Sequence, residues 1–168
     1  MNKNHQSLTE IWLLFDNRPE HPTVNYLDAV EEAICFGWID GIQKRFSSYE
    51  LAQRFTPRKK RSNWTELNKA RARRLINLGL MTEAGRAVLP DLNAEFVIAE
   101  DILEVLRENP DVWSNFLKFP DLYRRVRIGY IEEVRKNRTE FERRLQNFVN
   151  KTAINKMFGN WNDTDRLP

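Results

Sequence analysis

The sequence has very few of the side chains that bind metals or form disulfides. Its 168 residues include a single cysteine, Cys35, and two histidines, His5 and His21. One thiol excludes an intramolecular disulfide, and so few nitrogen and sulfur ligands exclude the usual structural zinc sites. We therefore expect a protein with no metal and no cofactor.

Long apolar runs are also missing. The longest one near the N-terminus, IWLLF at 11–15, is too short for the apolar part of a signal peptide or for a membrane span. This absence predicts a cytoplasmic protein. With 41% hydrophobic residues, 30% charged residues and only 6 glycines, the chain has the composition of an ordinary globular protein, not of a disordered or fibrous one.

The formal net charge of +3 hides an uneven distribution along the chain. Residues 1–43 carry 2 basic and 7 acidic side chains, and residues 44–74 carry 11 basic and 2 acidic ones. The counts are 1 and 4 for residues 75–100, and 13 and 11 for residues 101–168. The excess positive charge therefore lies in one central block of +9, which is expected to attract an anionic partner by long-range electrostatics.

Apolar periodicity in the first half predicts a strand, a helix and a hairpin. The apolar run at 10–16 is typical of a buried strand. Apolar residues at helical spacing then predict a helix that begins at Asn25 and ends near Gly37. Strands over 39–46 and 49–56 follow, joined by a turn of two serines.

The hairpin register decides which side chains face the core. A two-residue turn pairs Phe46 with Tyr49 and places Lys44 opposite Leu51. The face expected to be buried carries the apolar side chains Ile42, Phe46, Tyr49, Leu51 and Phe55. Lys44 falls on this same face, so either the register is wrong there or its ammonium group reaches the sheet edge or a ligand.

The rest of the chain is expected to be helical. Asn63 and Glu66 have the spacing of a capping box, which predicts a helix that ends at Gly79. A short helix over 82–89 follows. Proline positions and apolar spacing predict further helices at 96–108, 112–119, 122–136 and 140–158.

This order of elements predicts an α+β fold, in which a small, mainly antiparallel sheet leads into a helical C-terminal lobe. We expect lobes over 1–92 and 93–168 that belong to one folding unit. Two apolar stripes in the second lobe are interpreted as a helix–helix contact or, alternatively, as the seam of a homodimer. The stripes are Tyr123, Val126, Tyr130 and Val134, and Phe141, Leu145 and Phe148.

An ordered series of motifs makes the chain similar to a known family. The series consists of EAICFGWIDG at 32–41, Lys44, QRFTPR at 53–58, Ser62, Trp64, Asn68 and NLGLMTEAG at 77–85. It resembles the bacteriocin-protection family, also called the YdeI/OmpD-associated family. The resemblance is strong over 24–89 and continues more weakly from Leu103 onward. It implies a bacterial cytoplasmic protein tied to envelope stress and to resistance against cationic antimicrobial peptides, and it implies no catalytic residues.

Within the basic block, the stretch QRFTPRKKRSNW suggests a surface that binds an anionic ligand or nucleic acid. Four consecutive cations precede a helix start, where free N–H groups and the helix dipole favour anions. The candidate binding residues are Lys44, Arg54, Arg58, Lys59, Lys60, Arg61, Asn63, Trp64 and Asn68. For nucleic acid, nearby aromatic side chains could stack on bases. The alternative is a solvated connection that binds nothing.

A second hypothesis is a small enzyme with a pocket around Asp40, Lys44, Trp64 and Asn68. Asp40 and Lys44 would act as a general acid and base from the same strand face. The simpler interpretation is a tight turn in which Asp40 caps backbone N–H groups. Cys35 is interpreted as a packing residue, because its helical neighbours are acidic and oppose formation of a thiolate.

Overall fold

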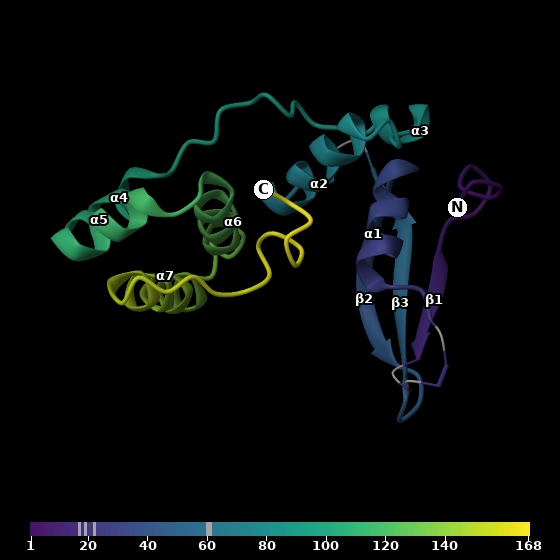
Figure 1. Cartoon of the computed structure of the whole chain (residues 1–168), viewed down its shortest axis with the longest axis horizontal. Coiled ribbons are helices and arrows are strands. Elements are labelled where there is room, and N and C mark those ends of the chain that lie inside the picture. The colour runs from purple at the N-terminus through teal and green to yellow at the C-terminus, as the bar shows by residue number, and fades with distance from the viewer. Residues whose placement is uncertain (17, 19, 22, 60–61) are drawn as a thin grey trace. The chain divides into compact units, whose positions relative to one another are not determined.

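The computed structural model describes residues 1–16, 18, 20–21, 23–59 and 62–168. Its strands and helices follow the order β1 (Ile11–Asp16), α1 (Tyr26–Cys35), β2 (Trp38–Arg45), β3 (Glu50–Pro57), α2 (Glu66–Asn77), α3 (Glu83–Arg86), α4 (Glu100–Arg107), α5 (Pro110–Lys118), α6 (Asp121–Glu132) and α7 (Arg138–Ala153) (Figure 1). A small antiparallel sheet followed by helices confirms the predicted α+β class.

The chain forms two compact units, each of which is described by itself. The first consists of residues 1–64 and 71–92, and the second of residues 65–70 and 93–168. Helix α2 contributes its first residues to the second unit and the remainder to the first. That the two units unfold as one cooperative unit stays a prediction.

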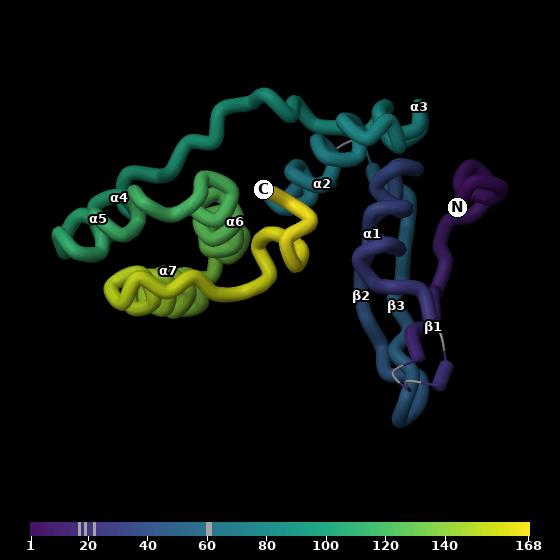
Figure 2. Tube along the Cα trace, in the orientation of Figure 1, coloured from purple at the N-terminus to yellow at the C-terminus, as the bar shows by residue number. Residues whose placement is uncertain are grey.

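The first unit is a three-stranded sheet with α1 along one face. The strand order is β1-β3-β2, and both pairs are antiparallel (Figure 2). Helix α1 begins at its N-cap Asn25, whose side chain accepts a hydrogen bond from the backbone N–H of Leu27 at 2.8 Å. Its apolar face and the sheet bury a common core that includes Phe15, Val30, Ala33, Ile34, Trp38 and Phe55.

The hairpin between β2 and β3 differs from the prediction by one residue. Lys44 pairs with Ala52 and Arg45 with Leu51, so the expected pairing is wrong. The backbone N–H of Phe46 donates to the carbonyl of Glu50 at 2.9 Å, which leaves a loop of three residues, 47–49. The hydroxyl of Ser47 accepts from the N–H of Glu50 at 3.1 Å, and this side-chain contact stabilises the longer loop.

The register change alters the faces of the hairpin, because successive side chains alternate across a sheet. Ile42, Phe46 and Tyr49, which were expected to be buried, are exposed to 53%, 69% and 53%. Phe55 is in the core as predicted. Lys44 lies with Ala52 on the face opposite to α1, and its Nζ is 5.3 Å from the centre of the Trp12 ring.

A β-bulge in β2 depends on the buried side chain of Gln53. The register shifts between Asp40, which pairs with Phe55, and Gln43, which pairs with Gln53. Two residues of β2, Gly41 and Ile42, therefore oppose one residue of β3. Gln53 is 3% exposed, and its Nε2 donates to the carbonyl of Gly41 at 2.9 Å and to that of Ile42 at 3.4 Å. The amide thus satisfies carbonyl groups that the interrupted ladder leaves unpaired.

Helix α2 begins later than the predicted capping box. At the start of the helix, the hydroxyl of Thr65 accepts a hydrogen bond from the backbone N–H of Asn68 at 3.2 Å. This role was predicted for the side chain of Asn63. The predicted C-terminal cap is confirmed, since Gly79 has φ +70° and the N–H of Leu80 donates to the carbonyl of Leu75 at 3.0 Å.

Helix α3 is shorter than predicted and closes the end of α1. It spans only Glu83–Arg86, with Thr82 as its N-cap. The backbone N–H and the hydroxyl of Thr82 both donate to the carbonyl of Cys35, at 3.2 and 2.5 Å. A Cβ added at Gly85 would lie 2.3 Å from the same carbonyl oxygen, so only glycine permits this close approach.

The second unit packs α4 to α7 around an aromatic core. Buried residues that form this core are Ile102, Leu106, Val112, Phe116, Phe119, Tyr123, Ile128, Ile131, Leu145 and Phe148. The predicted stripes of α6 and α7 contribute Tyr123, Leu145 and Phe148 to it, whereas Tyr130 is 43% exposed. Helix α7 ends at Ala153, five residues before the predicted end, and Phe158 packs against the core from outside the helix. In the described part of the chain, no helix has the length and apolar content needed to cross a membrane.

Replacing Gln53 by methionine is expected to lower the free energy of unfolding by about 1–3 kcal/mol, because the bulge carbonyls lose their buried donor. Urea denaturation measures the change. The matched control is Gln43→Met, at the exposed cross-strand partner of Gln53, which should stay within about 0.5 kcal/mol of the wild type. Equal effects of the two substitutions would contradict the role assigned to Gln53.

Candidate functional site

Arg58 is the best-defined residue among those predicted to bind an anion. It follows the last residue of β3, and its backbone N–H donates to the carbonyl of Gly37 at 2.8 Å. Its side chain is folded inward, so that the residue is only 6% exposed. The guanidinium carbon lies 3.6 Å from the centre of the Trp64 ring, and Nη1 donates to the carbonyl of Asn63 at 3.1 Å. Stacking and one hydrogen bond therefore hold the group in place.

The other edge of the Arg58 guanidinium has no hydrogen-bond partner among the residues that the structure describes. Its Nε and Nη2 atoms are buried and make no hydrogen bond within the described part of the chain. Burial lowers the pKa of Arg58 to about 10, and the negative charge of Asp40 acts in the opposite direction. A buried cation whose donors are left unpaired is energetically costly. The surroundings of Arg58 therefore favour an incoming anion.

Trp64 provides a fixed surface for this cation. The residue is 8% exposed, and its indole N–H donates to the carbonyl of Val88 at 3.2 Å. This hydrogen bond ties the ring to the segment after α3 and orients its face toward Arg58. The structure thus brings together Arg58, Asn63 and Trp64 from the predicted set.

Lys59, the next residue after Arg58, makes contacts of a different kind. Lys59 is exposed, and its backbone N–H donates to the hydroxyl of Ser62 at 2.9 Å, while the N–H of Ser62 donates to the carbonyl of Lys59 at 2.9 Å. Lys60 and Arg61 lie outside the described residues, so their predicted role stays a prediction.

Lys44 and Arg54 have partners other than the Arg58 group. The Nε atom of Arg54 donates to a carboxylate oxygen of Glu10 at 2.8 Å and lowers the pKa of that carboxyl. The ammonium group of Lys44 lies over Trp12, on the sheet face that α1 does not cover. Both residues therefore interact with side chains in or next to β1, namely Glu10 and Trp12.

Asp40 and Lys44 do not form the expected pair on one strand face. Asp40 shares the face of Phe55 and accepts a hydrogen bond from the hydroxyl of Tyr26 at 2.7 Å, whereas Lys44 shares the opposite face with Ala52. The reason is the bulge between them, which reverses the alternation of side chains. Asn68 is buried in α2, in the segment assigned to the second unit.

Several cations of the central basic block form ion pairs with carboxylates of the chain. Arg54 pairs with Glu10, Lys69 with Glu66 at 2.6 Å, and Arg74 with Glu31 at 2.8 Å. Two of these carboxylates come from the acidic N-terminal residues 1–43. Tertiary contacts therefore neutralise part of the charge that the sequence concentrates in residues 44–74.

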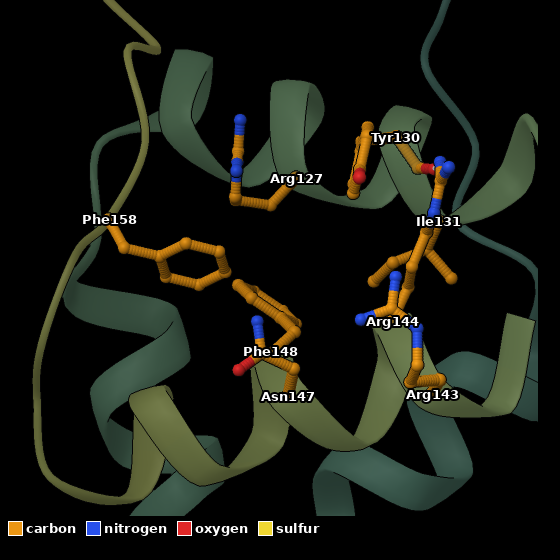
Figure 3. A pocket seen from close by; sticks show the side chains of 8 residues that line it. All are labelled: Arg127, Tyr130, Ile131, Arg143, Arg144, Asn147, Phe148 and Phe158. Atoms are coloured by element: carbon orange, nitrogen blue, oxygen red, sulfur yellow. The ribbon is translucent and has the colours of Figure 1, made fainter. Parts of the chain in front are cut away.

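No site was predicted for α6 and α7, which hold a pocket lined by three arginines, Arg127, Arg143 and Arg144 (Figure 3). A signal was available in the sequence. Arg127 stands at helical spacing between Tyr123 and Tyr130, within the apolar stripe of its helix. A cation in that position indicates a polar group on a packing face.

The fold and these groups define an α+β protein with an arginine held on an aromatic ring. The chain belongs to the family described as Domain of unknown function (DUF8412), whose model matches residues 1–88. Residues 95–155 match the model of a second family, described as Bacteriocin-protection, YdeI or OmpD-Associated. The second match confirms the resemblance, although it falls on the helices and not on the segment 24–89 where the likeness was expected to be strongest. Comparisons with the curated proteins and with the solved structures gave no match.

Cys35 has the properties predicted from its neighbours. It is 5% exposed, and burial raises the pKa of its thiol to about 11, with further contributions from the charges of Glu32 and Glu31. The native thiol is therefore expected to react with Ellman's reagent at pH 8 more than about a hundredfold more slowly than the urea-unfolded chain. Similar rates in the two states would contradict this.

The Arg58 site also makes a prediction about stability. Because the pKa of Arg58 is lowered in the folded state, its charge opposes folding at every pH below about 10. Arg58→Met is thus expected to leave the free energy of unfolding at pH 7 within about 1 kcal/mol of the wild type or to raise it. Trp64→Ala should lower it by about 3–5 kcal/mol. Urea denaturation of both variants checks this, and a large loss in Arg58→Met would indicate a purely structural cation.

Proposed function

We propose that the chain is a cytoplasmic binding protein of the bacteriocin-protection type, which recognises an anionic group at Arg58. The observation that carries the proposal is the guanidinium edge formed by Nε and Nη2, which is buried and has no hydrogen-bond partner in the described part of the chain. These two atoms form the side of the guanidinium that binds a carboxylate or phosphate with two parallel hydrogen bonds. An anion there would accept both donors and offset the buried charge.

A single phosphate or carboxylate group fits this site better than a long polyanion does. Arg54, Lys69 and Arg74 already interact with carboxylates of the chain itself. Less of the basic block is therefore free to follow a phosphate backbone. Lys59, which is exposed beside Arg58, would add a second positive charge to the site.

The proposal extends to the biological setting of the protein. It places the protein in the bacterial cytoplasm, in a pathway of envelope stress and resistance to cationic antimicrobial peptides. Support comes from the match of residues 95–155 and from the motif resemblance in the first half of the chain. A chain with a net charge of +3 repels cationic peptides, so its effect is expected to be indirect, through regulation or an intracellular partner.

Binding of inorganic phosphate, and of labelled mixed-sequence DNA and RNA over a salt series, tests the proposal. Wild-type protein is expected to bind phosphate, and Arg58→Met should weaken binding by about tenfold or more, since a charge-assisted bidentate contact is lost. Calorimetry measures the phosphate affinity and fluorescence anisotropy that of the polymers. The matched control is Arg86→Met, at an exposed arginine in α3 of the same unit.

The polymers distinguish two sources of the phosphate group. Binding of DNA or RNA that weakens steeply with salt and is lost in Arg58→Met identifies a nucleic acid as the partner. Binding of free phosphate without the polymers identifies a small anion or a modified protein. Equal affinities of Arg58→Met and the wild type, or no binding of any of the three at low salt, would reject the Arg58 site.

A further inference from the structure

The second unit contains a pocket that none of the preceding functional assignments uses. It lies between α6 and α7 beside the segment after α7, and has a volume of about 150 Å³ (Figure 3). Aromatic side chains, Tyr130, Phe148 and Phe158, form much of its wall, and three arginines and Asn147 supply polar groups. A cavity with apolar walls and few, convergent polar groups is the usual form of a small-molecule site.

Arg127 is the unusual member of this pocket. Its Nε atom is buried without a hydrogen-bond partner, and the residue has no ion pair among the residues that the structure describes. Its guanidinium carbon is 5.0 Å from the centre of the Phe158 ring and 5.6 Å from that of Tyr130. Burial lowers the pKa of Arg127. Two aromatic rings thus hold a cation that no carboxylate neutralises.

The position of Arg127 is determined by the chain around it. Gly159 has φ +74°, and a Cβ added there would lie 2.7 Å from Nη1 of Arg127. The backbone after α7 therefore passes directly against the guanidinium, at a residue whose positive φ favours glycine. This close approach holds Arg127 at the end of the pocket that is next to Phe158.

The other two arginines are already neutralised. Arg143 and Arg144 each donate to Glu140, with shortest distances of 2.7 and 2.8 Å, and Arg144 also lies 3.9 Å from a carboxylate oxygen of Glu133. Arg144 further donates to the carbonyl of Tyr130 at 2.6 Å and stacks on that ring at 3.7 Å. Three cations against two carboxylates leave one positive charge, which is that of Arg127.

We propose that this pocket binds a small aromatic carboxylate. The carboxylate would accept from Arg127 and supply the one negative charge that the pocket lacks, and the ring would pack against Phe148 and Phe158. A monoanion matches the excess of one charge, whereas a phosphate monoester, with nearly two charges, would exceed it. The site goes beyond the function proposed above, since it lies in the other unit and shares no residue with the Arg58 site.

A purely structural role for Arg127 predicts the opposite effect on stability. If cation–π contacts alone explain the residue, its replacement lowers the melting temperature of the free protein. If the residue is kept for a ligand, Arg127→Met removes a half-buried charge whose Nε donor is unsatisfied and leaves the melting temperature of the free protein equal or higher. The stability of the free variant therefore separates the two roles without any ligand.

Thermal unfolding and calorimetry of the full chain with benzoate test the proposal. Benzoate is expected to raise the melting temperature of the wild type, and Arg127→Met should weaken its binding by about tenfold or more. The control Arg138→Met changes an arginine of α7 whose side chain is 90% exposed and should bind benzoate like the wild type. Benzamide, which has the ring without the charge, should not bind.

Several results would overturn the proposal. They are benzamide bound as tightly as benzoate, phenyl phosphate bound more tightly than benzoate, no binding of benzoate by the wild type, or unchanged affinity in Arg127→Met. If Arg127→Met does not fold, amide chemical shifts of the wild type decide, since benzoate must perturb Asn147 and Phe158 and benzamide must not. Arg58→Met should bind benzoate normally, so failure of the Arg58 proposal leaves this one intact.

Discussion

A guanidinium that packs on an aromatic ring, with a buried donor and no carboxylate partner, constrains the groups around it, and each unit has one among the residues that the structure describes. Arg58 lies on Trp64 and Arg127 lies between Tyr130 and Phe158, and in both cases the Nε atom has no hydrogen-bond partner in the described part of the chain. An aromatic face lowers the energy of such a cation but does not satisfy its donors. The two sites that we propose follow from this imbalance, which an anion would correct.

The sheet of the first unit shows how one irregularity changes the chemistry that a strand presents. The bulge between Asp40 and Gln43 is stabilised by the buried amide of Gln53. Because it adds one residue to β2, it turns Asp40 toward the side of Tyr26 and Lys44 toward Trp12. Asp40 and Lys44, which the sequence places four residues apart, therefore lie on opposite faces of the sheet. This geometry is evidence against their joint action as acid and base in an enzyme pocket.

The two family models divide the chain in nearly the same way as the two compact units do. The model of the DUF8412 family covers residues 1–88, and that of the bacteriocin-protection family covers residues 95–155. The motifs that suggested the latter family lie mostly in the first of these segments. A function attached to the family name therefore concerns the helical unit first, and the pocket beside Arg127 gives that unit a chemical property of its own.

The sequence by itself determined the order and type of the elements, the start of α1 near Asn25 and the cap at Gly79, because helical periodicity and glycine conformation are local properties. Only the tertiary structure decided the hairpin register, since a turn of two or three residues fits the same serines and depends on pairing across strands. It also decided which cations are paired. Arg54 and Arg74 meet carboxylates that lie more than forty residues away in the chain, and within the described residues the Nε atom of Arg127 has no hydrogen-bond partner. Such contacts form only when the chain is folded, so no local pattern could predict them.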